Sequence, residues 1–244
     1  IKSTKTIKMK IAIVVPTYYR NDGSSYEIVK KTLESVKCQS HKDWHLFLIG
    51  DKYENKEEFI KLSEVLGDKC TSVNLPIAKE RDKYKDNKQA LWRTGGVNAN
   101  NVGIELALFC GFDYIAHLDH DDLWKENHLE VISKCIEETN SVFICTKASY
   151  KGFAVLPTVQ FEPEAMYKQF YPNMAQQIHS SVCVNFRKLK SRYVDFFELR
   201  NDLSPSDGIL AIDLRNELKE KGYLSTLINE ITVIHDKEGY TLIS

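Results

Sequence analysis

An acidic cluster directly follows an apolar run in the segment YIAHLDHDDLW, residues 114–124. Its three carboxylates are Asp119, Asp121 and Asp122. Burial and mutual repulsion both disfavour three charged carboxylates at the end of a buried strand, so a positive group is expected beside them. In an extended strand, residues i and i+2 point to one side about 6.5–7 Å apart, so we expect Asp119 and Asp121 to face together and His120 to face away.

Two carboxylates at that spacing can bind one divalent cation together with its water shell. Oxygen ligands at a partly open site favour Mg²⁺ or Mn²⁺, because these ions keep several waters and accept substrate phosphates. The alternative is that Asp121 or Asp122 caps a helix that begins near Trp124. The spacing alone leaves both interpretations open.

The elements before the cluster alternate between strand and helix patterns. Apolar, strand-like runs occur at KIAIVVPTY, WHLFLIGD and CTSVNLPI, with amphipathic helical patterns between them. The lysine-rich segment at about 78–94 is predicted to be a mobile loop, and a helix over about 98–110 is predicted to lead into the acidic strand. Such alternation predicts a mainly parallel, doubly wound α/β sheet, whose ligands bind beyond the carboxyl ends of its strands.

The pattern changes after about residue 141. The runs SVFICTKASY and KGFAVLP predict a hairpin, SSVCVNF and EITVIHD predict further strands, and Leu210, Leu214 and Leu218 mark a late helix. We therefore predict a single overall domain made of a larger lobe, residues 1–140, and a smaller mixed lobe, residues 141–244.

The composition is that of an ordinary globular protein. Its 244 residues are 43% hydrophobic and carry a net charge of −1, without the basic stripe typical of nucleic-acid binding. Six widely spaced cysteines without a C-x-x-C motif predict buried, reduced thiols and a cytoplasmic location. No apolar run approaches the roughly 20 residues of a membrane span. Peripheral membrane association and the oligomeric state are left open.

Four stretches together resemble the inverting glycosyltransferase family 2: VVPTYYR, LIGD, GGVNANNVGIELALFCGFDYIAHLDHDDLW and HSSVCVNFRKL. The resemblance is strong over about residues 10–129 and looser beyond, and the D-x-D-D element is its specific part. It implies the type-A nucleotide-diphospho-sugar transferase (GT-A) fold, with the donor bound by residues 1–140 and the acceptor by residues 141–244. It also implies a metal-dependent, inverting transfer of a sugar from a nucleoside diphosphate, expected to be UDP, to a hydroxyl of a glycan, lipid or protein.

The resemblance assigns the donor site residue by residue. The residues assigned to the donor are Pro16, Thr17, Tyr18, Asp51, Asn101 and Asp119. The resemblance implies that Thr17 and Tyr18, just after Pro16, form a wall beside the base and that Asp51 contacts the base or the ribose. Relatives often carry Arg before the Asn of the N-x-G motif, where this chain has Asn100. Arg93 or a lysine of the preceding segment is the expected substitute.

The metal ligands implied by the resemblance are Asp121, Asp119 and His235, with Asp119 also on the ribose side. Asp122 is expected to be structural, and the cofactor is Mn²⁺ or Mg²⁺. All of these residues except His235 belong to the acidic cluster.

The catalytic base implied by the resemblance is Asp207, just before the late helix. The family has an acidic residue before this Asp, where this chain has Ser206, and Asp213 is the second candidate. Asp207 can also cap the helix. Because of these departures, a catalytically inactive module that binds glycan or nucleotide sugar is the alternative function. The retained carboxylates argue against it.

Overall fold

The computed structural model describes residues 9–152, 154–174, 176–197 and 204–235. The strands in it are β1 (Ile11–Thr17), β2 (Trp44–Gly50), β3 (Cys70–Asn74), β4 (Tyr114–His117), β5 (Leu123–Trp124), β6 (Phe143–Tyr150), β7 (Ala154–Leu156), β8 (Tyr167–Gln169), β9 (Val182–Asn185) and β10 (Ser225–His235). The helices are α1 (Ser25–Lys37), α2 (Lys56–Glu64), α3 (Lys79–Lys83), α4 (Lys88–Thr94), α5 (Val97–Phe109), α6 (His128–Thr139) and α7 (Ser206–Glu220), with 3₁₀ turns η1 (Gly67–Lys69) and η2 (His179–Ser181).

The strands of the first half pair in parallel. β1 pairs with β2 on one side and with β4 on the other, and β2 pairs with β3. The chain thus adds β2 and β3 on one side of β1 and then returns to add β4 on the other side, so the order of the strands reverses between β1 and β4. In sheets of this kind, ligands bind beyond the carboxyl ends of the two strands at such a switch point. Here those ends are Thr17 and His117.

The strands of the second half extend the same sheet with mixed polarity. Among the described residues the strand order is β3-β2-β1-β4-β9-β6-β10-β5, with β7 paired to β6 and β8 to β10. β6 and β10 are parallel, whereas β9 runs antiparallel to both β4 and β6. The predicted mainly parallel α/β sheet with a smaller mixed part is confirmed. The functional division between residues 1–140 and 141–244 stays a prediction.

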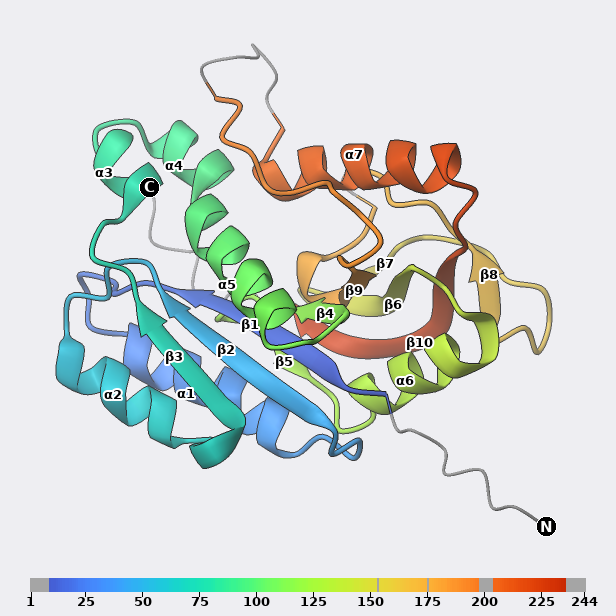
Figure 1. Ribbon diagram of the computed structural model, residues 1–244, viewed down its shortest axis with the longest axis horizontal. Helices are drawn as coiled ribbons and strands as arrows, with labels where there is room; N and C mark the ends of the chain where they lie inside the picture. The colour runs from blue at the N-terminus through green and yellow to red at the C-terminus, as the bar shows by residue number, and fades with distance from the viewer. Residues whose placement is uncertain (1–8, 153, 175, 198–203, 236–244) are drawn as a thin grey trace.

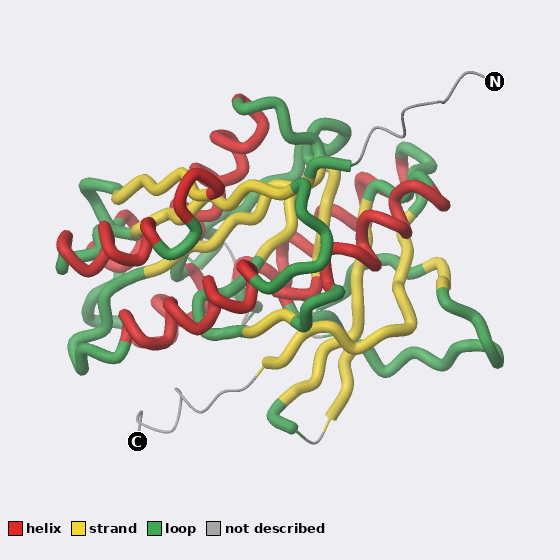
Figure 2. The backbone as a smooth tube through the Cα atoms, turned by 90° about the horizontal axis from the view of Figure 1, so that it is seen from below, coloured by secondary structure: helices red, strands yellow, loops and turns green. Residues whose placement is uncertain are grey.

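Helices cover both faces of the sheet (Figures 1 and 2). One hydrophobic cluster joins α1, α2 and α6 to one face, and a second joins α5 and α7 to the other. β1 contributes Ile11, Ile13 and Val15 to the first cluster and Ala12 and Val14 to the second. A strand buried on both faces requires such a continuous apolar run, which explains the lack of alternation in its sequence.

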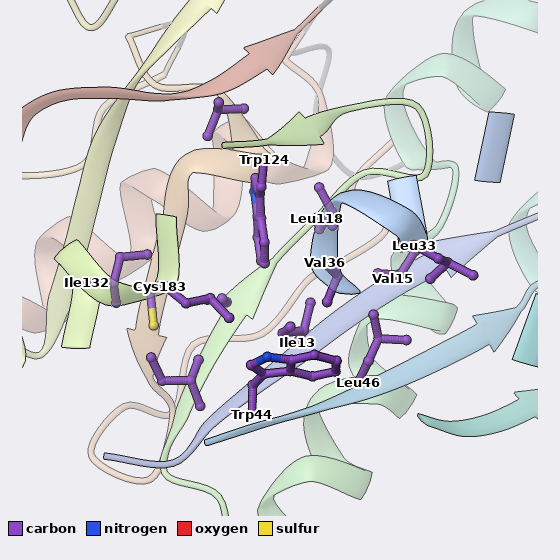
Figure 3. Close-up of a cluster of buried hydrophobic side chains, with 14 of the residues drawn as sticks. Ile13, Val15, Leu33, Val36, Trp44, Leu46, Leu118, Trp124, Ile132 and Cys183 are labelled. Carbon is purple, nitrogen blue, oxygen red and sulfur yellow. The ribbon is translucent and has the colours of Figure 1, made fainter. Parts of the chain in front are cut away.

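The first cluster also supports the acidic segment. Figure 3 shows Leu33 and Val36 of α1 beside Ile13 and Val15 of β1, with Trp124 nearby. Trp124 is 4% exposed, and its indole Nε1 donates a hydrogen bond to the Ser180 carbonyl (2.8 Å). The backbone that follows the acidic cluster is therefore anchored in the core.

Two predictions about local structure were wrong. The acidic cluster does not cap a helix beginning near Trp124, because residues 123–124 form β5 and pair with Val233 and Ile234 of β10. The next helix begins at His128. The segment at 78–94 is not a loop, since it contains α3 and α4. The Asn87 side chain caps α4 by accepting a hydrogen bond from the Ala90 amide (3.0 Å).

Candidate functional site

The acidic residues lie in a turn beyond the end of β4. The strand ends at His117, and the Asp122 amide donates to the Asp119 carbonyl (3.1 Å), which closes a turn over residues 119–122. The expected extended spacing of the two carboxylates is therefore wrong. From α1, the Thr32 hydroxyl lies 2.8 Å from the His120 carbonyl and 3.0 Å from that of Asp122, so the helix holds the turn in place.

Each carboxylate of the turn has a basic partner from a distant segment. The pairs are His179 Nδ1 with Asp119 Oδ1 (2.7 Å), Arg20 Nη2 with Asp121 Oδ2 (3.1 Å) and His235 Nδ1 with Asp122 Oδ1 (2.7 Å). The exposed fraction of the side chain is 37% for Asp119, 24% for Asp121 and 1% for Asp122. Only the first two can therefore reach a ligand, and Asp122 serves the interior.

The pKa values of Asp119 and Asp122 are shifted in opposite directions. Burial favours the neutral form of Asp119, but the attraction of His179 and its hydrogen bond prevail and lower the pKa of Asp119 to about 2. Burial raises the pKa of Asp122 to about 6, against the hydrogen bond from His235. Asp119 is thus held as an anion at the surface of the turn.

His120 faces the end of β1, but it shares Arg20 with Asp121, so the prediction that it turns away from both carboxylates was wrong. Its Nδ1 lies 3.3 Å from the Pro16 carbonyl, and its Nε2 accepts from Arg20 (3.1 Å). The Tyr18 ring packs edge-on against His120 at 5.1 Å between centroids. Residues 16–18 therefore connect the acidic turn to the end of β1.

Asp51 and Arg81 form a second polar group, at the carboxyl end of β2. Arg81 Nε donates to Asp51 Oδ2 (2.9 Å), and the guanidinium lies over the Tyr18 ring at 5.3 Å. The Asp51 amide donates to the Thr17 carbonyl (2.7 Å), which places this carboxylate beside the end of β1. Burial raises the pKa of Asp51 although Arg81 opposes this shift. Among the described residues, Asp51 Oδ1 and Thr17 Oγ1 are buried without a hydrogen-bond partner.

Asn101 is not placed like the other predicted donor residues. Its amide exchanges two hydrogen bonds with the Tyr193 backbone, at 2.8 and 3.0 Å, so it ties α5 to the segment before α7. The preceding residue, Asn100, donates to the Gly96 carbonyl (3.0 Å). Arg93, the expected substitute, is buried and lies over the Phe197 ring at 5.7 Å.

Asp207 lies in the first turn of α7, where Oδ1 accepts a hydrogen bond from the Gly208 amide (2.8 Å). Burial raises its pKa, attraction to His179 opposes the shift, and repulsion from Asp119 adds to it. Asp207 thus shares the electrostatic surroundings of the acidic turn. Asp213 lies six residues further along α7, about 9 Å along the helix axis.

Reasoning from sequence missed the importance of Arg20 and His179. Arg20 follows the VVPTYY run and His179 begins η2, the 3₁₀ turn before β9, but no local pattern indicates which carboxylate each one contacts. His235 is predicted from sequence to be a metal ligand. Its Nδ1 is bonded to Asp122 Oδ1, and its ring stacks on the ring of Tyr150 with 5.2 Å between centroids.

A divalent cation fits this site only in part. Among the described residues, no group of three or more His, Cys, Asp and Glu side chains is arranged to hold a metal ion. Asp119 and Asp121 offer partly exposed carboxylate oxygens, which suit Mg²⁺ or Mn²⁺ when waters and substrate phosphates complete the coordination.

Within the described ranges, no helix has both the length and the apolar character needed to cross a membrane.

Comparisons with known proteins show the family and the fold. No model of a protein family matches the sequence. An uncharacterized glycosyltransferase of Acanthamoeba polyphaga mimivirus is 34% identical over 241 residues, 96% of each protein. The succinoglycan biosynthesis protein ExoW of Rhizobium meliloti is 28% identical over 122 residues, 49% of this chain and 32% of that protein.

Solved structures share the fold. The structure of S. aureus TarS 1-349 in complex with UDP-GlcNAc superposes with a TM-score of 0.65 at 14% sequence identity. The superposition covers 97% of this chain and 62% of the TarS chain. The fold rests on this likeness and the family on the full-length match to the mimivirus protein. The chain therefore belongs to the glycosyltransferases, as a family 2-like protein with a GT-A-type fold.

Proposed function

We propose that this glycosyltransferase transfers a sugar from a UDP-sugar to a hydroxyl of a glycan, lipid or protein, with inversion and with Mn²⁺ or Mg²⁺ as cofactor. The observation that carries the proposal is the placement of Asp51, Asp119 and Asp121 beyond the carboxyl ends of β2 and β4, the two parallel neighbours of β1. The cytoplasmic location stays a prediction from cysteine content.

The base of the donor would bind at Asp51. Its Oδ1 is buried without a partner in the described residues, so an N–H from a base such as uracil would satisfy it. The Tyr18 ring beside it offers an aromatic wall, and Arg81 holds the other carboxylate oxygen. S. aureus TarS was crystallised with UDP-GlcNAc, which makes this the first donor to test.

Asp119 and Asp121 would bind the cation on the diphosphate side. When bound, Mg²⁺ or Mn²⁺ would neutralise the charge that develops on the leaving diphosphate. Asp119, held as an anion by His179, would also accept a hydrogen bond from the ribose. Arg20 must leave Asp121 Oδ2 if that oxygen is to contact a cation.

Asp207 would act as the general base. Its carboxylate takes the proton from the acceptor hydroxyl, and the oxygen attacks the anomeric carbon from the face opposite the diphosphate. The bond from that carbon to the diphosphate breaks, and the nucleoside diphosphate leaves. The raised pKa of Asp207 suits a base, because a carboxyl group with a pKa closer to neutral accepts a proton more readily.

A thermal-shift panel of UDP, GDP and TDP, each with and without Mn²⁺, tests the donor assignment. A ligand at 100 times its Kd stabilises the folded state by about 2.7 kcal/mol, or roughly 5–10 °C for a chain of this size. We expect the largest shift with UDP and Mn²⁺ together. The absence of a shift under all six conditions would contradict the proposal. Hydrolysis of UDP-GlcNAc with Mn²⁺ would separate an active enzyme from an inactive binding module.

A further inference from the structure

The imidazole of His179 is bonded at both of its nitrogens. Nδ1 lies 2.7 Å from Asp119 Oδ1, and Nε2 bonds to the hydroxyl of Tyr193. The side chain is only 10% exposed. A carboxylate accepts hydrogen bonds and does not donate them, so Nδ1 carries the hydrogen of the bond to Asp119.

The group behind His179 is anchored in the core. Tyr193 is 3% exposed, and its hydroxyl also lies 3.3 Å from His117 Nδ1. The Tyr193 backbone is held by both ends of the Asn101 amide on α5. Asn101 on α5 therefore holds Tyr193 in place, and the Tyr193 hydroxyl in turn holds the imidazole of His179.

The group in front of His179 is much less constrained. The Asp119 side chain is 37% exposed, although its backbone amide is held by the Ser180 hydroxyl at 2.9 Å. Within the described ranges, the Asp119 carboxylate is held through Oδ1 by its hydrogen bond from His179. Without it, the two torsions of the Asp119 side chain would be free to turn toward solvent.

We propose that His179 is a positioning residue that orients Asp119 toward the nucleotide-sugar donor, an inference that rests on the proposed function. The bond at Oδ1 fixes the plane of the carboxylate and leaves Oδ2 for the ribose or the cation. A charge-assisted hydrogen bond is strong enough to select one side-chain conformation. His179 itself does not contact the reacting atoms.

A matched pair of substitutions separates orientation from packing. In His179→Asn the amide nitrogen can take the place of Nδ1 and still donate to Asp119. In His179→Gln the amide reaches the place of Nε2, and the bond to Asp119 is lost. Both substitutions remove the same ring, so a role in packing alone predicts equal effects. His45→Gln, a histidine on β2 bonded to Thr71 at 2.8 Å, is the control away from the site.

The first measurement is the Kd for UDP in the presence of Mn²⁺, by calorimetry, with the ligand-free melting temperature of each variant as a check on folding. We expect His179→Asn to bind within about threefold of the wild type and His179→Gln to bind about tenfold more weakly. Equal affinities in the two variants, weakened or not, would overturn the proposal. If neither variant folds, Tyr193→Phe replaces them, and an unchanged Kd in that variant would overturn the proposal.

The second measurement does not depend on the donor. Crystal structures of the two variants should show the Asp119 conformation retained in His179→Asn and altered in His179→Gln. The same conformation in both would overturn the positioning role. If the wild type binds no UDP with Mn²⁺ while the Asp119 conformations differ as expected, the proposed function fails and the positioning role stands.

Discussion

Arg20 and Asp121 form an ion pair, with 3.1 Å between Nη2 and Oδ2, inside the turn that carries the proposed cation site. Arg20 Nη2 also donates to His120, so the guanidinium is shared between two consecutive residues of the turn. The protein itself therefore places one positive group beside the acidic cluster. A cation that binds Asp121 through Oδ2 must displace this guanidinium.

Removing Arg20 should therefore increase the affinity for Mn²⁺ alone. The pair is partly exposed, so its interaction energy is about 0.2–1 kcal/mol. Because a cation no longer has to displace the guanidinium, Arg20→Gln should bind Mn²⁺ up to about fivefold more tightly than the wild type. Asp121→Asn should bind it more weakly. Mn²⁺ titrations followed by electron paramagnetic resonance measure both. An unchanged affinity in Asp121→Asn would exclude this residue as a ligand.

Replacing Asp51 should weaken UDP binding. Its buried Oδ1 needs a donor, and a hydrogen bond to a charged group contributes about 1.5–3 kcal/mol, so Asp51→Ala should raise the Kd for UDP by roughly 10- to 100-fold. Calorimetric titration with UDP measures this effect. Glu54→Gln is the matched control, because Glu54 also reaches Arg81 (3.5 Å) but is half-exposed. If both variants bind UDP alike, the base does not contact Asp51.

His128 should make folding stability depend on pH. It is fully buried and stacked on Trp124, and burial lowers its pKa to about 3. The unfolded chain takes up a proton near pH 6.5 and the folded chain does not, so stability is lost as the pH falls below 6.5. Between pH 7 and pH 5, His128 should account for a loss of about 2 kcal/mol.

Urea unfolding of the wild type and of His128→Gln at both pH values measures this contribution. The variant should lose about 2 kcal/mol less stability than the wild type between pH 7 and pH 5, because glutamine does not titrate. The comparison between the two proteins cancels the contributions of the other buried histidines. Equal losses in both would show that His128 is protonated in the folded state.

The parallel half of the fold was predictable because its signals are local. The apolar run that became β1 is continuous since both faces are buried, and the helical pattern at α5 leads directly into β4. β5 was not predictable. Two residues, Leu123 and Trp124, become a strand only because β10, about 110 residues later, provides the partner. A short strand made by a distant pairing leaves no periodic pattern of its own.

The candidate site was predictable in its acids and not in their partners. Asp51, Asp119 and Asp121 follow strands and Asp207 lies in the first turn of a helix, positions that a sequence indicates. The bond between His179 and Asp119 spans 60 residues and depends on how β9 joins β4. Asn101 stands in an N-x-G motif, but its amide is used by the Tyr193 backbone.

Substitution of Asp207 tests the proposed mechanism most directly. The measurement is the rate of sugar transfer, to water or to an acceptor, from UDP-GlcNAc, UDP-glucose and UDP-galactose in the presence of Mn²⁺. Loss of a general base costs about 100- to 10,000-fold in rate, so Asp207→Asn should lose transfer at this scale and retain UDP binding, whereas Asp213→Asn should keep both. Because the base acts ionised and burial raises the pKa of Asp207, the wild-type rate should fall as the pH is lowered through that pKa. Transfer by Asp207→Asn at the wild-type rate would contradict the account.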